Sequence, residues 1–155
     1  ATVAPQPAKG PSNDVKADRQ FIQEVAADNT LEIRLGQMAQ RQASGSDVKR
    51  LADRMVSDFT RWQDRWTSMA SRNGLPVQPG MGNLHRQKLE RLQKASKGQF
   101  DRVYVRTVIE NLQSIVPYFE NEGRSARSSQ VRNLVQDELP TLRQHLEMAK
   151  RINKS

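Results

Sequence analysis

Three residues that could hold a proton or a metal ion fall on the apolar seams of predicted helices: Glu32, Glu138 and His145. Asn111 occupies the same kind of position and directly follows Glu110. A carboxylate taken out of water without a partner is unfavourable, so Glu32 must be paired, hydrogen-bonded or protonated. His145 is the expected partner, because a neighbouring helix could bring its imidazole to this carboxylate.

Two interpretations of these inward polar residues are open. In the first, they form a satisfied internal network that fixes the register of the helices. In the second, they form a metal site inside the bundle, of the kind that facing helices build in carboxylate-bridged proteins. The candidate metal ligands are Glu32, His145, Glu138 and Glu110.

The sequence lacks the motif of a carboxylate-bridged di-iron centre. Such a centre uses four carboxylates and two histidines, with two Glu-x-x-His repeats. The residue three positions before His85 is Gly82, and the residue three positions before His145 is Leu142. We therefore expect either no cofactor or a single, weakly held divalent metal ion.

The segment 46–72 has an apolar seam with no polar interruption. Its large apolar residues recur at intervals of four, three, four and three, which is the rhythm of a heptad seam on a helix. These residues are Met55, Phe59, Trp62, Trp66 and Met69. The pattern predicts a core stripe, and it raises the question of whether Phe59 fills a place where a functional residue could stand.

Glycine-rich and proline-rich breaks divide the chain into four long helices and one short helix. The predicted helices cover 18–44, 46–72, 83–97, 99–122 and 125–152. We predict an all-α, up-down four-helix bundle over 18–153, with consecutive long helices antiparallel and the short helix between the second and third. The proline-rich segment 1–17 is predicted to be a flexible tail.

Composition excludes several classes of protein. The 155 residues contain no cysteine, which excludes disulfides, thiol catalysis, iron–sulfur clusters and cysteine-based zinc sites. The sequence has no glycine-rich phosphate loop and no nucleophile elbow, so we expect no enzymatic activity. No apolar run approaches the ~20 residues of a transmembrane helix.

The net charge of +8 permits binding to an anionic partner. However, cations and acids alternate along the chain, which is typical of solvated helix faces with local ion pairs. An example is the run Arg50, Asp53, Arg54, Asp58, Arg61, Asp64 and Arg65. An anionic envelope polymer or a protein remains a candidate partner, and the interleaved charge disfavours nucleic acid.

Four segments, in this order and spacing, resemble a known family. They are NTLEIRLGQMA at 29–39, VKRLADRMVSDF at 48–59, FDRVY at 100–104 and LPTLRQHLEMA at 139–149. They resemble the ferritin-like domain-of-unknown-function family 4142, a group of bacterial exported proteins often labelled outer-membrane proteins. The resemblance implies a ferritin-like four-helix bundle, a signal peptide on the precursor, and a periplasmic or cell-envelope location. The start of the sequence at Ala1 fits a mature exported protein.

The resemblance also implies that histidine positions have degenerated in this chain. Relatives carry histidine where Phe59 follows Asp58 and where Asn111 follows Glu110, whereas Glu32 and His145 match positions that the family keeps. Phenylalanine cannot ligate a metal, and an amide is a poor substitute for imidazole.

We therefore expect a non-enzymatic exported bundle protein with a structural, stress-related or interaction role, lacking the full metal site of its relatives. One alternative is a weak metal-binding or storage protein that uses an intra-bundle Glu/His site. A second alternative is a basic binder of an anionic envelope polymer or of nucleic acid.

Overall fold

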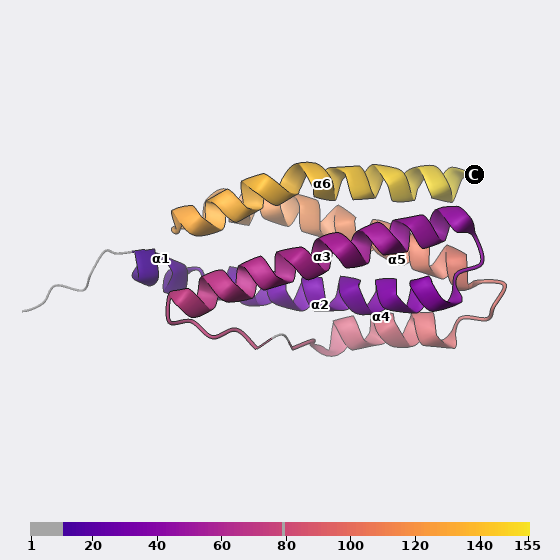
Figure 1. Cartoon of the computed structure of the whole chain (residues 1–155), viewed down its shortest axis with the longest axis horizontal. Helices are drawn as coiled ribbons and strands as arrows, with labels where there is room; N and C mark the ends of the chain where they lie inside the picture. The colour runs from indigo at the N-terminus through magenta and orange to yellow at the C-terminus, as the bar shows by residue number, and fades with distance from the viewer. Residues whose placement is uncertain (1–10, 79) are drawn as a thin grey trace, which may run out of the picture.

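Four long helices lie side by side along the length of the molecule, and a shorter helix packs along them (Figure 1). The computed structural model describes residues 11–78 and 80–155. The elements are α1 (Pro11–Ala17), α2 (Arg19–Gln42), α3 (Ser46–Arg72), α4 (Asn83–Lys94), α5 (Phe100–Tyr118), the π-helical segment η1 (Phe119–Gly123) and α6 (Ser129–Lys154). These described ranges contain no β-strand, so the predicted all-α class is confirmed.

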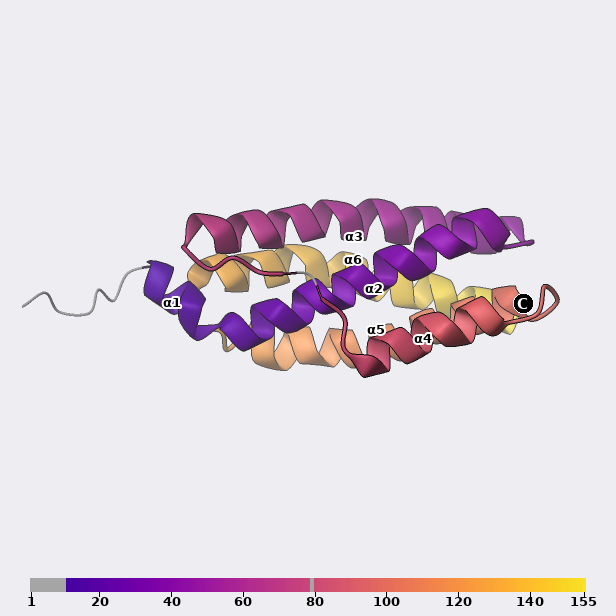
Figure 2. The same cartoon turned by 90° about the horizontal axis from the view of Figure 1, so that it is seen from below.

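The chain does not reverse direction at every connection between long helices. In Figure 1, α2 runs from left to right and α3 returns from right to left; the segment 73–99, which contains α4, then runs back along the bundle. As a result α5 runs in the same direction as α3, and α6 runs antiparallel to α5 (Figure 2). The prediction that consecutive long helices are all antiparallel is therefore wrong at this junction. An extended stretch followed by the 12-residue α4 is long enough to cross the bundle.

The apolar seam of α3 lies in the core as predicted. Its five large residues, from Met55 to Met69, are each at most 3% exposed. Further aromatic side chains fill the space beside it, and the ring of Phe21 contacts Trp66 edge-on with the ring centroids 5.9 Å apart. Burial of this stripe against the other helices is the main source of its helical stability, because isolated helices gain little from propensity alone.

Two aspartates connect elements that are distant in the sequence. The carboxylate of Asp101, at the start of α5, accepts hydrogen bonds from the backbone N–H groups of Ser44 and Gly45, at 3.0 and 2.8 Å. The carboxylate of Asp18 accepts from the N–H groups of Arg127 and Ser128, at 2.9 and 2.8 Å. Both contacts satisfy backbone donors in the turns that precede helices.

The ends of α3 and α5 follow from local chemistry. Gly74 has a φ of +74° and supplies a left-handed stop after α3. The helix predicted over 99–122 instead ends at Tyr118 and continues as η1 to Gly123. Pro117 lies just before this change, and a proline removes a backbone donor from the regular hydrogen-bond ladder.

The segment 1–17, predicted to be a flexible tail, is only partly covered by the structure. Residues 1–10 lie outside the described residues. Pro11–Ala17 forms α1, because Val15 is apolar and packs fully buried in the core. In the described ranges, no helix has both the length and the apolar character needed to cross a membrane.

Candidate functional site in the bundle core

Glu32 lies on α2 and is 1% exposed. Its Oε1 accepts a hydrogen bond from Nδ2 of Asn111 at 2.6 Å, and Oδ1 of Asn111 accepts one from Nζ of Lys88 at 2.6 Å. Burial raises the pKa of Glu32 to about 8, while the bond from Asn111 opposes this rise and the charge of Asp28 adds to it. Glu32 is therefore protonated at neutral pH.

Two buried oxygens beside this chain of bonds have no hydrogen-bond partner within the described part of the molecule: Oε2 of Glu32 and the hydroxyl of Tyr104. The pKa of Tyr104 is raised by burial and by the charge of Glu32. Lys88 and Asn111 also line a cavity of about 250 Å³ between α2, α4 and α5. The bonds from Lys88 to Glu32 thus connect a surface cavity to a buried carboxyl group.

His145 does not pair with Glu32. Its Nε2 lies 2.7 Å from Oδ2 of Asp58, on α3, and its side chain is 2% exposed. Burial lowers the pKa of His145, and the hydrogen bond to Asp58 opposes this shift. The neutral imidazole donates Nε2–H to Asp58, which leaves Nδ1 buried and without a partner among the described residues.

Aromatic rings occupy the space around this imidazole. The ring of Phe59 stacks on His145, with centroids 6.0 Å apart and planes 27° apart. The ring of Trp62 lies 5.7 Å from the same imidazole, measured between centroids. Phe59 therefore packs directly against the histidine that was predicted to be a metal ligand.

Glu138 forms a separate buried pair. Nε1 of Trp66 donates to both carboxylate oxygens of Glu138, at 3.0 and 2.9 Å, and Glu138 is 1% exposed. Burial raises the pKa of Glu138 to about 8, although the bond from Trp66 and the charge of Arg65 act in the opposite direction. The indole holds the carboxyl group in place while the core keeps its proton on at neutral pH.

Glu110, the fourth predicted ligand, lies outside the core. Its side chain is 56% exposed, and its carboxylate is 3.8 Å from Nη1 of Arg91. His85 is bound to Asp28, with Nε2 2.7 Å from Oδ1. Neither residue contributes to the groups around Glu32, Glu138 or His145.

The four predicted ligands are therefore divided among separate contacts. Within 11–78 and 80–155, no three His, Asp or Glu side chains come together in a group that could hold a metal ion. The residues present do not fit a resident metal centre, and the core polar groups instead form pairs that join facing helices.

Sequence reasoning missed the partners of these groups. The alternating charges predict Asp58 to be a surface residue, and the apolar rhythm predicts Trp66 to be core packing without a polar contact. A signal for Trp66 was present, because Glu138 interrupts an apolar seam and a buried carboxyl group requires a donor. The hydrogen-bond donors on the seam of α3 are the indole N–H groups of Trp62 and Trp66.

The fold and the paired core polar groups define an all-α helical-bundle protein. A family model described as "Domain of unknown function (DUF4142)" matches residues 2–152, so the chain belongs to this family. No curated protein matches the chain.

Two solved structures share the fold. One, described as "CopM in the Cu(II)-bound form", is 22% identical with a TM-score of 0.76, over 88% of this chain and 95% of that chain. The other is a DUF305 fragment from Deinococcus radiodurans, 17% identical with a TM-score of 0.78, over 96% of this chain and 99% of that chain. At these identities the likeness concerns the fold alone.

Proposed function

We propose that this chain is a non-enzymatic helical-bundle protein of the cell envelope, with a structural, stress-related or interaction role. In this proposal the core polar residues hold the helices in register and do not form a metal centre. The observation that carries it is the contact between Phe59 and His145, whose ring centroids are 6.0 Å apart. The phenyl ring lies against the face of the imidazole and brings no ligand atom to it, and Nε2 is bound to Asp58.

We further propose a ferritin-like arrangement of the four long helices. The parallel direction of α3 and α5, with one long crossover between them, supports it (Figure 1). Ferritin-like bundles have one such crossover connection, whereas simple up-down bundles have short loops throughout. The family resemblance supports export to the periplasm or cell envelope.

Metal analysis of the full chain, purified without an affinity tag, tests the proposal. We expect no stoichiometric iron, zinc or copper, and no rise in the melting temperature when any of these ions is added. Stoichiometric metal bound with micromolar affinity would overturn it. The solvent-exposed Glu110→Gln variant, measured in parallel, reports any metal effect that comes from the surface.

The second candidate function is weak metal binding or storage. Two observations favour it: a structure with this fold is described as Cu(II)-bound, and Nδ1 of His145 lacks a partner in the described structure. This function predicts that His145→Ala abolishes any metal-dependent rise in melting temperature. An equal rise in the variant would exclude His145 as a ligand.

A further inference from the structure

A groove of about 400 Å³ lies between the outer face of α6 and the turn that follows η1. Three arginines line it: Arg124 from the turn, and Arg132 and Arg143 from α6. Asn133 and Gln136 add neutral polar groups to the same lining. Leu139 and Pro140 are the apolar residues of the lining. We call the groove lined by these seven residues the arginine groove.

The backbone holds the two walls of the arginine groove close together. Gly123, at the end of η1, lies so close to α6 that a Cβ atom there would stand 2.7 Å from Cγ2 of Val135. This approach places Arg124 beside the stripe of α6 residues that recur every three or four positions. Nη1 of Arg132 donates to the carbonyls of Ala126 and Arg127, at 2.5 and 2.8 Å, which fixes this guanidinium and leaves its remaining N–H groups free to bind a ligand.

The charge of the arginine groove is unbalanced. Its lining contains three guanidinium groups and no carboxylate. The nearby carboxylate of Glu120 accepts a hydrogen bond from Nη2 of Arg143 at 3.1 Å, which offsets one of the three charges. Two positive charges remain, and Arg124 has no ion-pair partner within the described ranges.

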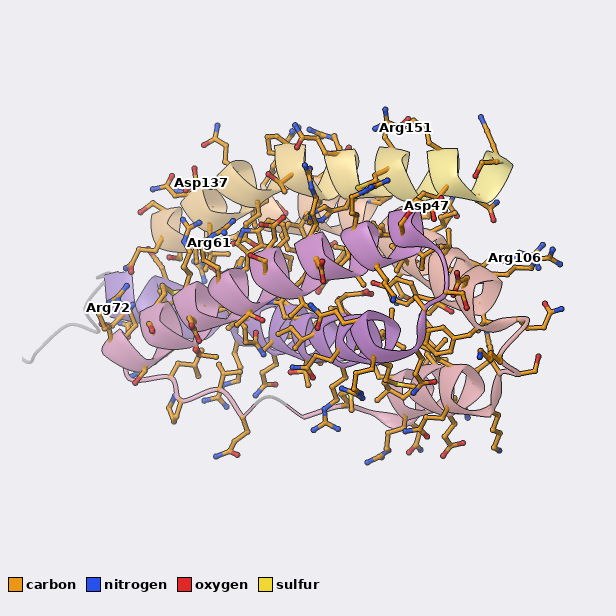
Figure 3. All side chains as sticks on the ribbon, turned by 45° about the vertical axis from the view of Figure 1, so that its right-hand side comes forward. Asp47, Arg61, Arg72, Arg106, Asp137 and Arg151 are labelled. Carbon is orange, nitrogen blue, oxygen red and sulfur yellow. The ribbon has the colours of Figure 1, made fainter. Side chains whose placement is uncertain are left out.

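A second groove, between α3 and α6, differs from the arginine groove in its balance of charge. It is also lined by three arginines, Arg61, Arg65 and Arg72, but its lining includes Asp64. Arg61 and Arg65 are paired with Asp58 and Asp137, at 3.1 and 3.0 Å. Figure 3 labels Arg61 on α3 and Asp137 on α6 at the same end of the molecule. Carboxylates therefore balance the arginines of this second groove.

We propose that the arginine groove binds a phosphomonoester group. A phosphomonoester carries a charge of about −1.5 to −2 at neutral pH, which matches the two uncompensated positive charges. Guanidinium groups bind phosphate oxygens in bidentate geometry, and the amides can donate to a further oxygen. Leu139 and Pro140 in the lining provide apolar contact for the organic part of the ligand. This site lies on the surface, so it adds to the proposed core function and does not depend on it.

Calorimetry with the full chain tests this proposal with two kinds of ligand. The soluble probe is glycerol 3-phosphate, with glycerol as the uncharged match. The lipid probe is a phosphatidylcholine vesicle containing phosphatidic acid, with pure phosphatidylcholine vesicles as the match. We expect binding to at least one phosphorylated probe, and no binding to glycerol or to pure phosphatidylcholine vesicles. The probe that binds identifies whether the ligand is a soluble phosphomonoester or a lipid headgroup.

Three variants locate the binding. Arg124→Gln and Arg143→Gln should each raise the dissociation constant about tenfold, because each removes a charge-assisted hydrogen bond. Arg72→Gln makes the same charge change in the second groove and should leave affinity nearly unchanged. Circular dichroism checks that each variant is folded. Absence of binding to both phosphorylated probes, or an equal loss in Arg72→Gln, would overturn the proposal, as would unchanged affinity in Arg124→Gln.

Discussion

The indole nitrogen of Trp66 donates to both carboxylate oxygens of Glu138, at 3.0 and 2.9 Å, and joins α3 to α6 in the interior of the bundle. Glu138 interrupts the apolar seam of α6, and the facing seam supplies its donor. A pair of this kind fixes the rotation and axial position of two helices relative to each other, since a shift of either helix separates the donor from the acceptor.

Removing this donor should destabilise the protein. Trp66→Phe keeps an aromatic ring but leaves Glu138 buried without its hydrogen bonds, which costs about 1–3 kcal/mol in addition to the loss of packing. Urea unfolding of Trp66→Phe, Glu138→Met and the double variant measures the coupling between the two residues, since methionine removes the acceptor and keeps a side chain of similar length. Trp62→Phe serves as the packing control, and strictly additive effects of the Trp66 and Glu138 changes would contradict the pairing.

The raised pKa of Glu32 predicts how stability depends on pH. Between the ordinary value of 4.5 and about 8, the folded state keeps the proton on Glu32 while the unfolded chain releases it. The folded state then binds more protons than the unfolded state, so the free energy of unfolding falls as pH rises through this window, by at most about 1.4 kcal/mol per pH unit for this group.

Glu32→Gln should remove this contribution and flatten the pH profile measured by urea unfolding. Glu110→Gln is the matched control, because it makes the same chemical change at a side chain that is 56% exposed. A Glu32→Gln profile parallel to that of the unmodified chain would show that Glu32 is ionised in the folded state. His145 acts with the opposite sign: its pKa is lowered from 6.5, so its contribution makes stability fall as pH drops below that value.

Phe59→His should create a metal site where the chain now has an aromatic contact. The new imidazole would lie beside His145, whose Nε2 is 2.7 Å from a carboxylate oxygen of Asp58. Two imidazoles and a carboxylate are ligands that suit zinc or copper. Titration calorimetry with Zn²⁺ and Cu²⁺ should detect binding in this variant, with Phe59→Leu as the control.

Asn111→His should give no comparable gain, because Asn111 contacts Glu32 and Lys88 and not His145. Equal metal affinity in Phe59→His and Asn111→His would contradict this prediction.

Gly123→Ala should destabilise the junction between η1 and α6. The added methyl group would lie 2.7 Å from Cγ2 of Val135, and overpacking of this kind costs about 1–3 kcal/mol. Shortening the opposing residue in Gly123→Ala/Val135→Ala should relieve the clash, so the double variant should be more stable than the sum of the single effects predicts. Thermal unfolding provides the measurement, and additivity would contradict the close approach.

Helical periodicity predicted the all-α class and which faces are buried. It placed Glu32, Asn111, Glu138 and His145 in the interior, and each is at most 4% exposed. Periodicity gives the inward face of a helix but not its axial position against a neighbour. For this reason the sequence could not distinguish a Glu32–His145 contact from the observed Asn111 and Asp58 contacts.

The direction of α5, the third long helix, could not be predicted from the sequence either. The connection 73–99 contains a helical piece and a proline-rich stretch, and its length permits either a return at one end or a crossing of the bundle. The choice depends on where α4 buries Leu89 and Leu92, which is a tertiary contact.

The crossover divides the chain into two helical hairpins, α2–α3 and α5–α6, each built from neighbouring sequence. Local contacts form faster than contacts that need a large loop to close, so each hairpin should assemble before the two dock. Three buried polar pairs link one hairpin to the other: Asn111 to Glu32, His145 to Asp58, and Trp66 to Glu138. Docking in a wrong register would bury carboxyl groups without donors. These pairs therefore favour the native register when the two hairpins assemble.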